Sequence, residues 1–215
     1  MASRIQVAQT ENKIFSTALL LVLACALALP TQVFAMESAS PVPSLPSFID
    51  SIKDGNATAL RGIYVEGLIA FPIIQQPYGN PGFVSNTDSV VTQFSIATEV
   101  GNVGLLAHNH LAGATFSQLK QGDTIILIYG DGHTQGFVVE SFQQYKATDP
   151  LSPYSHFKDL SSDTTLSALD LFNKIYRGDY HLTLQTCIEN EGNLSWGRLF
   201  ITAKPVSDKD ANGLE

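Results

Sequence analysis

Short β-rich segments separated by turn residues are the feature that most constrains how this chain folds. At least six such runs are visible, and several alternate between apolar and polar residues. They lie at residues 62–74, 90–96, 103–110, 124–129, 135–145, 181–187 and 198–203. Gly130-Asp131-Gly132 supplies the turn of a hairpin between two of them. The pattern predicts a mainly β domain, either a small barrel or a sandwich.

Two segments have helical patterns and belong on the outside of that domain. Residues 45–52 place Phe48 and Ile52 on one face. Residues 166–177 carry an apolar stripe and precede Gly178, a residue type that often ends a helix. Residues 75–88 and 148–162 are rich in turn-forming residues and are expected to be loops.

Composition excludes several classes of protein. Of the 215 residues, 44% are hydrophobic and 15% are charged, which argues against an intrinsically disordered chain. With a net charge of -8, the chain lacks the excess of basic residues that is typical of nucleic-acid-binding proteins. Two cysteines are too few for a disulfide scaffold.

The N-terminus is typical of an exported protein. Arg4 and Lys13 precede an apolar run at residues 14–29, and Val33-Phe34-Ala35 provides small residues for a cleavage site before Met36. An uncleaved membrane anchor is the alternative, although the run falls short of the roughly 20 residues that span a bilayer. The expected organisation is therefore a signal peptide or anchor (1–35), a spacer with a short helix (36–54), one β domain (55–204) and a polar tail (205–215).

Cys187 is the one cysteine left after such a cleavage, so it has no partner for an internal disulfide. Alternation along residues 181–187 places Leu182 and Leu184 on one face of a strand and Cys187 on the other. A structural cysteine would more often lie with the leucines. This placement favours a reactive thiol, which needs a proton donor and a group that stabilises an oxyanion.

Candidates for these partners follow from position in the chain. His108 and His110 end an apolar strand and point to the same face, and residue spacing alone does not choose between them. Arg198 begins the strand after the cysteine loop and comes near Cys187 if the two strands pair. His133 and His156 are expected in solvated turns and loops, and His181 lies too far along the cysteine strand to meet the thiol.

The combination of these segments resembles the sortase family of cysteine transpeptidases. Leu182-Thr183-Leu184-Gln185-Thr186-Cys187, followed by Arg198, is similar to the family's T-L-x-T-C…R signature. Leu105-Leu106-Ala107-His108-Asn109 resembles the strand that ends in the catalytic histidine, and residues 116–125 resemble the segment after it. The resemblance covers about residues 62–203. It departs from the family at Ala107, where glycine is usual, and at the second histidine, His110.

This resemblance implies a closed β-barrel of about eight strands with one or two short peripheral helices. It implies that Cys187 is the nucleophile, His108 the general acid and Arg198 the group that binds the oxyanion, with His110 as a secondary candidate. Thr186 and Trp196 are the candidate substrate-binding residues. The implied reaction cleaves a sorting motif in an exported protein through a thioacyl enzyme and transfers it to an amine at the cell surface. No cofactor and no metal are expected, and the expected location is extracellular or the cell envelope.

Three other interpretations remain open. One is a cysteine peptidase on the same scaffold without transfer, and another is a non-catalytic exported binding module. The third is a metal site at His108 and His110, for which His133, His181 or Asp131 would have to supply a further ligand. Calcium binding, known in some sortases, would have to use loop acids whose spacing does not indicate a site: Glu99, Asp149, Asp159 and Asp163.

Overall fold

The computed structural model describes residues 42–152 and 154–206. The expected signal peptide or anchor at residues 1–35 lies outside the described residues, as do the first part of the expected spacer and most of the polar tail. In the described part of the chain, no helix is long and apolar enough to cross a membrane.

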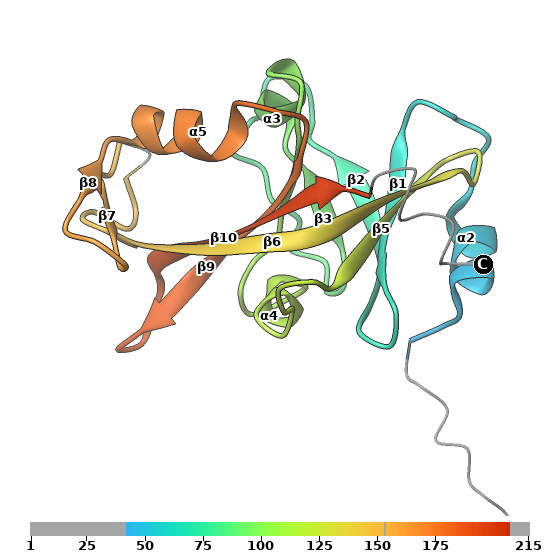
Figure 1. The fold of residues 1–215 in the computed structure, drawn as a ribbon, viewed down its shortest axis with the longest axis horizontal. Coiled ribbons are helices and arrows are strands. Elements are labelled where there is room, and N and C mark those ends of the chain that lie inside the picture. The colour runs from blue at the N-terminus through green and yellow to red at the C-terminus, as the bar shows by residue number, and fades with distance from the viewer. Residues whose placement is uncertain (1–41, 153, 207–215) are drawn as a thin grey trace, which may run out of the picture. The chain divides into compact units, whose positions relative to one another are not determined.

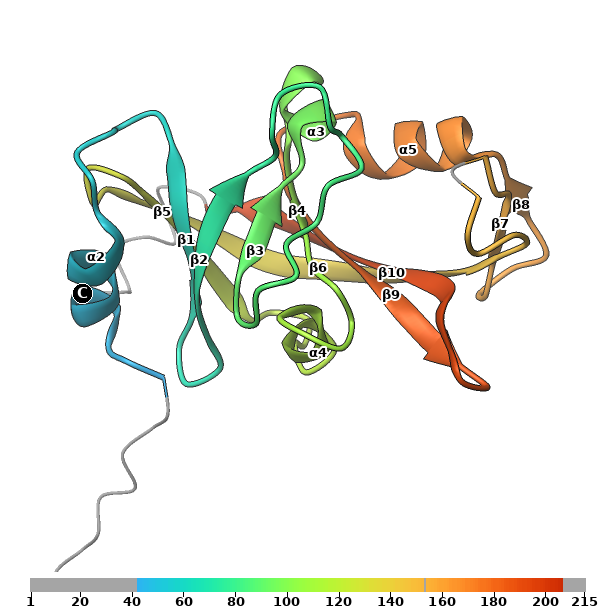
Figure 2. The same cartoon turned by 180° about the vertical axis from the view of Figure 1, so that it is seen from behind.

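Eight strands form a closed barrel (Figures 1 and 2). They are β1 (Leu60–Val65), β2 (Ile69–Gln75), β3 (Val91–Gln93), β4 (Val103–Leu106), β5 (Thr124–Tyr129), β6 (Thr134–Ala147), β9 (Leu182–Asn190) and β10 (Asn193–Pro205). The order around the barrel is β10-β9-β4-β3-β2-β1-β5-β6, and pairing of β10 with β6 closes it. Two pairs are parallel, β2 with β3 and β4 with β9, and the others are antiparallel. The mainly β, closed-barrel fold expected from the sequence is confirmed.

Two short strands and four helices decorate this barrel in the described residues. The strands β7 (Phe157–Asp159) and β8 (Thr165–Leu166) continue the sheet outward from β6. The helices are α2 (Leu45–Ile52), α3 (Ser95–Glu99), α4 (Gly113–Phe116) and α5 (Ala168–Tyr176). Both views show α5 and the β7–β8 hairpin at one end of the domain and α2 at the other (Figures 1 and 2).

The helix boundaries follow from side-chain caps. Ser44 and Ser167 lie just before α2 and α5, and each hydroxyl accepts a hydrogen bond from a main-chain N–H three residues later. Gly178 follows α5 with a φ of 111°, a conformation that suits glycine. The two helices expected from the sequence are therefore present, and the bounds of α2 agree with the expectation.

The core fills the barrel interior, and every barrel strand contributes to it. Leu105, Leu127 and Leu184 are fully buried there, and burying one such side chain contributes about 2 kcal/mol. Outside the barrel, α5 packs against Tyr145 of β6 and Phe200 of β10. The helix therefore covers part of the outer face of the sheet, close to β9.

Several expected strand bounds were wrong. Strand β4 ends at Leu106, so His108 and His110 lie in the loop after it rather than on the strand. Residues 95–96 belong to α3 and not to the expected strand 90–96. The expected loop after Cys187 is mostly strand, because Glu191 and Gly192 adopt positive φ values of 52° and 77° and make a tight hairpin turn. Cys187 therefore lies within β9 and not at its end.

Candidate functional site

Cys187 and Arg198 are direct neighbours across the sheet. Strands β9 and β10 pair antiparallel, and their register places Arg198 opposite Cys187. Directly opposed residues have Cβ atoms about 5 Å apart. The sequence predicted that Arg198 comes near Cys187 if these two strands pair, and the structure shows that pairing.

The parallel pairing of β4 with β9 brings His108 to the same place. Leu106, the last residue of β4, is in register with Gln185, and the Ala107 N–H donates to the Gln185 carbonyl over 3.1 Å. The chain leaves the sheet one residue later. His108 thus emerges beside the part of β9 that carries Cys187.

One pocket of about 170 Å³, called the cysteine pocket below, collects the three residues predicted to be catalytic. His108, Cys187 and Arg198 all line it, together with Gln185, Thr186 and Val84. These residues come from β9, β10 and the loops that follow β2 and β4. The barrel topology thus assembles a thiol, an imidazole and a guanidinium that are far apart in the sequence.

Cys187 also borders a second pocket, of about 270 Å³, on the side of α4. Asn109, Ser117 and Glu189 are among the residues that line it. The Cys187 thiol is free and half-buried. Because it lies between two open cavities, an extended peptide can approach it from either one.

The two neighbouring histidines are stacked. Their ring centroids are 5.4 Å apart, and His108 is half-buried whereas His110 is exposed. Partial burial is the main cause that lowers the pKa of His108 below its ordinary 6.5, and the adjacent His110 lowers this pKa further. A backbone hydrogen bond at Val84 acts in the opposite direction. His108 is therefore mostly neutral at pH 7.

The influence of His110 gives a testable pH dependence. Removing a like charge favours the protonated form, so His110→Ala is expected to raise the pKa of His108 while leaving it below 6.5, since burial remains. An NMR titration of the His108 ring measures this shift. His133→Ala is the control, because His133 stacks on Tyr129 away from the site. An unchanged or lower His108 midpoint in His110→Ala would contradict this account of the pair.

The Arg198 side chain is held by its own hairpin. Its Nη1 donates to the carbonyl oxygens of Ser195 and Gly197 over 3.0 and 2.9 Å, and its Cζ lies 5.9 Å from the Phe157 ring centroid. Among the described residues, Nε and Nη2 have no hydrogen-bond partner. Three N–H groups are thus left to bind a substrate oxygen.

Asn109 connects the histidine loop to the same hairpin. Its Nδ2 donates to the Leu194 carbonyl over 3.0 Å. The loop that carries His108 and the hairpin strand that carries Arg198 are therefore linked directly by a hydrogen bond.

The two residues predicted to bind substrate lie in different surroundings. Thr186 is 4% exposed and lines both pockets at Cys187, and within the described chain its hydroxyl has no hydrogen-bond partner. Trp196 instead packs against Lys146, whose Nζ lies 5.6 Å from the centroid of the Trp196 ring. Among the described residues that line those two pockets, Trp196 is absent.

An apolar pocket of about 290 Å³ adjoins the cysteine pocket. It lies between α5 and the outer face of β9 and β10, and Phe94, Phe157, Phe172 and Phe200 are among its lining residues. Gln185 and Arg198 line both this pocket and the cysteine pocket. A substrate segment that starts among the aromatic rings can therefore continue to the thiol.

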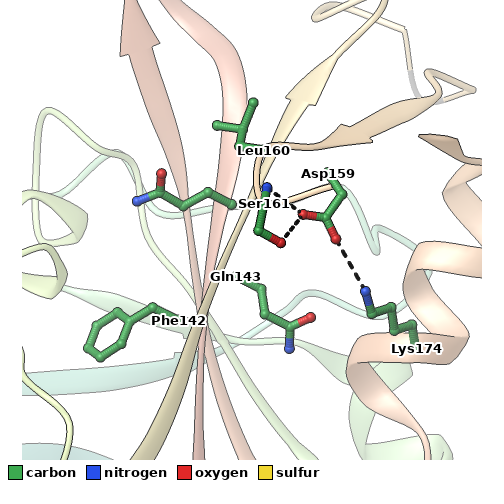
Figure 3. A pocket seen from close by; sticks show the side chains of 7 residues that line it. Phe142, Gln143, Asp159, Leu160, Ser161 and Lys174 are labelled. Atoms are coloured by element: carbon green, nitrogen blue, oxygen red, sulfur yellow. Dashed lines mark hydrogen bonds and ion pairs between the residues drawn. The ribbon is translucent and has the colours of Figure 1, made fainter. Parts of the chain in front are cut away.

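A further cavity, of about 300 Å³, has Gln144 in common with the 270 Å³ pocket beside Cys187. Figure 3 shows it between β6, the β7–β8 hairpin and α5, with Phe142, Gln143 and Leu160 on its walls. Its charged groups are paired: Asp159 accepts from the Ser161 N–H and hydroxyl over 2.8 and 2.7 Å and pairs with Lys174 over 3.5 Å. It contains none of the predicted catalytic residues.

The further ligands that a histidine metal site would need are engaged elsewhere. His133 pairs with Asp131 over 2.5 Å. The two ring nitrogens of His181 lie 2.7 and 2.8 Å from the carbonyl oxygens of Asp179 and Ile175. Within residues 42–152 and 154–206, no group of three or more His, Cys, Asp or Glu side chains is arranged to hold a metal ion.

Sequence reasoning missed Val84, Asn109 and Gln185 as parts of the site. Val84 and Asn109 reach it through loop contacts that no periodicity encodes. Gln185 had a usable signal, since it lies two residues before Cys187 and therefore shares its face of the strand.

Comparisons with known proteins return similarities of structure only. No family model and no curated protein sequence matches the chain. Sortase C-1 from Actinomyces oris is 16% identical, with 78% of this chain and 83% of that chain covered and a TM-score of 0.46. A sortase D5 transpeptidase from Clostridium perfringens is 14% identical, with 76% and 87% covered and a TM-score of 0.44. Sortase A from Corynebacterium diphtheriae is 14% identical, with 71% and 64% covered and a TM-score of 0.46.

Proposed function

We propose that this chain is a sortase-like cysteine transpeptidase that cleaves a sorting motif in an exported protein and passes the acyl fragment to an amine. The observation that carries the proposal is the single pocket lined by His108, Cys187 and Arg198. The sequence resemblance assigns a role to each of these three residues. The predicted export segment at residues 1–35 supports action in the cell envelope or outside the cell.

The first half-reaction makes a thioester. Neutral His108 takes the thiol proton of Cys187, and the sulfur attacks a substrate carbonyl, forming a C–S bond while the carbonyl π electrons move to oxygen. The unpartnered N–H groups of Arg198 stabilise that oxyanion. When the tetrahedral intermediate collapses, the C–N bond breaks and His108, now an imidazolium, protonates the departing amine.

The second half-reaction releases the acyl group. An incoming amine attacks the thioester carbonyl, gives up a proton to His108, and forms an amide as the C–S bond breaks. The sulfur leaves as a thiolate and regains its proton from His108. Water in place of the amine gives hydrolysis, which is the peptidase alternative.

One experiment with two arms separates the open alternatives. Wild-type protein is incubated with a positional-scanning library of internally quenched hexapeptides, with and without glycinamide as the acceptor amine. Transpeptidation is expected to give the acyl fragment joined to glycinamide in place of part of the free acid. Free acid alone, with no joined product, would identify a peptidase, and intact peptides throughout would indicate a binding module.

Arg198→Lys is expected to lower kcat/KM for peptide cleavage about 100-fold, the usual effect of losing a preorganised oxyanion donor. Lysine keeps the charge but lacks the planar fork that holds the Ser195 and Gly197 carbonyls and still offers donors to the pocket. Arg177→Lys is the matched control, because Arg177 is exposed and bonds only to Asn173 among the described residues. A wild-type rate for Arg198→Lys would show that Arg198 has no catalytic role.

A further inference from the structure

Gln185 lies where the cysteine pocket meets the apolar pocket. It precedes Cys187 by two residues on β9, so its side chain projects from the same face at a spacing of about 6.8 Å. The side chain is half-buried and lines both pockets. A peptide that spans the two cavities must pass over it.

Tyr176 of α5 fixes the orientation of the Gln185 amide. The Tyr176 hydroxyl lies 2.7 Å from Gln185 Oε1. Tyr176 is 2% exposed, and burial raises the pKa of its phenol, so the hydroxyl keeps its proton and donates a hydrogen bond to the amide oxygen. The Gln185 oxygen is thereby occupied, and its nitrogen is directed away from Tyr176.

Tyr176 is itself held in place on all sides. The centroids of the Phe94 and Phe172 rings each lie 5.3 Å from that of the Tyr176 ring. A β-carbon on Gly104 would lie 3.0 Å from Tyr176 Cε1, so the ring uses space that only glycine leaves. Asn102 Nδ2 donates to the Tyr176 carbonyl over 2.9 Å. The hydroxyl is therefore presented to Gln185 in a fixed position.

The Gln185 nitrogen remains as a donor. Within residues 42–152 and 154–206 it has no hydrogen-bond acceptor, although it lies at the junction of two open cavities. An extended peptide repeats its orientation every two residues, about 6.8 Å, which equals the spacing from Cys187 to Gln185. When one peptide carbonyl lies at the thiol, the carbonyl two residues away lies near Gln185.

We infer that Gln185 Nε2 donates a hydrogen bond to a main-chain carbonyl of the acyl-donor peptide, two residues from the carbonyl that Cys187 attacks. Tyr176 is the positioning residue that fixes the amide for this contact. The inference rests on the proposed function and adds to it a contact that selects an extended peptide backbone. Such a bond forms before and during the reaction alike, so it acts on substrate binding.

The test uses the best hexapeptide from the library scan, with formation of the glycinamide-joined product as the readout. Gln185→Glu keeps an acceptor for Tyr176 and removes the donor, and Gln185→Leu removes both. Each is expected to raise KM about tenfold and to leave kcat within about twofold. Tyr176→Phe is expected to raise KM about threefold, and adding it to Gln185→Leu is expected to have no further effect.

Gln143 provides a matched control. It accepts a hydrogen bond from the Tyr145 hydroxyl over 3.1 Å, as Gln185 does from Tyr176, but it lines the cavity of Figure 3, which none of the predicted catalytic residues lines. Gln143→Leu is expected to leave both KM and kcat at wild-type values. Melting temperatures of all variants check the fold.

A modified peptide separates binding from a merely structural role. The peptide carbonyl two residues from the cleaved bond is replaced with a methylene group. This change is expected to raise the KM of the wild type about tenfold and to leave the KM of Gln185→Leu unchanged. Equal sensitivity of both enzymes, or a wild-type KM for Gln185→Glu, would overturn the inference while the proposed function stands. If the wild type forms no thioacyl adduct with any peptide of the library, both fail together.

Discussion

A Cys187→Ala variant is expected to lose peptide cleavage and transfer by at least about a thousandfold and to form no thioacyl adduct. The reason is chemical: removing the sulfur leaves His108 and Arg198 in the pocket with no nucleophile between them. The rate is measured with the hexapeptide library and the adduct by intact mass spectrometry.

The fold should survive this substitution. Cys187 is free and half-buried, and the described part of the chain shows no hydrogen bond to its thiol, so alanine leaves no buried polar group without a partner. The melting temperature is therefore expected to change by only a few degrees. An alanine variant that cleaves and joins peptides at the wild-type rate would show that another residue is the nucleophile.

His108→Ala is expected to lower kcat/KM about 100- to 1,000-fold, within the usual range for removing a general acid–base group. His108 lines the cysteine pocket and is half-buried there. In the proposed reaction His108 protonates the leaving amine, and no other imidazole lines the cysteine pocket within the described residues to replace it. Added imidazole is expected to restore part of the rate.

His110→Ala is the comparison for this variant. His110 is exposed, stacks on the His108 ring and is not among the described residues that line the two pockets at Cys187, so its removal is expected to lower the rate by no more than about threefold. If the two variants exchange their effects, the proton donor is His110 and the assignment taken from the sequence resemblance is wrong.

Much of this fold was predictable because the sequence patterns that encode it are local. Strand β5 and helix α2 have the expected bounds, since apolar periodicity and the flanking Ser44 cap and Gly130 turn define them. The hairpin turn at Glu191 and Gly192 was not predicted. Its positive φ values extend β9 and β10 well into a segment whose composition suggested a loop.

The site was predictable in part for a similar reason. Residue alternation along β9 and the apolar start of β10 indicated that Cys187 and Arg198 could be neighbours, and the register confirms it. The approach of His108 depends on a parallel pairing of β4 with β9, two strands far apart in the chain. Tyr176 reaches Gln185 from α5 across the outer face of the sheet, and no sequence periodicity reports a contact of that kind.

The two faces of β9 also differ from the expectation. The same alternation puts Thr183 and Gln185 on the polar face with Cys187, yet Thr183 is fully buried and Gln185 is half-buried, because the C-terminal end of α5 packs over them. The same helix forms a wall of the apolar pocket. The polar face of β9 is therefore covered in part by α5, and it borders the pocket that leads toward Cys187.

The central claim is that Cys187 carries the acyl group, and trapping the thioester tests it most directly. Wild-type protein is mixed with the best library peptide at pH 7, quenched in acid and digested, and the Cys187 peptide is weighed by mass spectrometry. The account predicts a mass increase equal to the acyl fragment on Cys187, which hydroxylamine removes as a hydroxamate. Cleavage of the peptide with Cys187 unmodified, or an adduct on another residue, would contradict it.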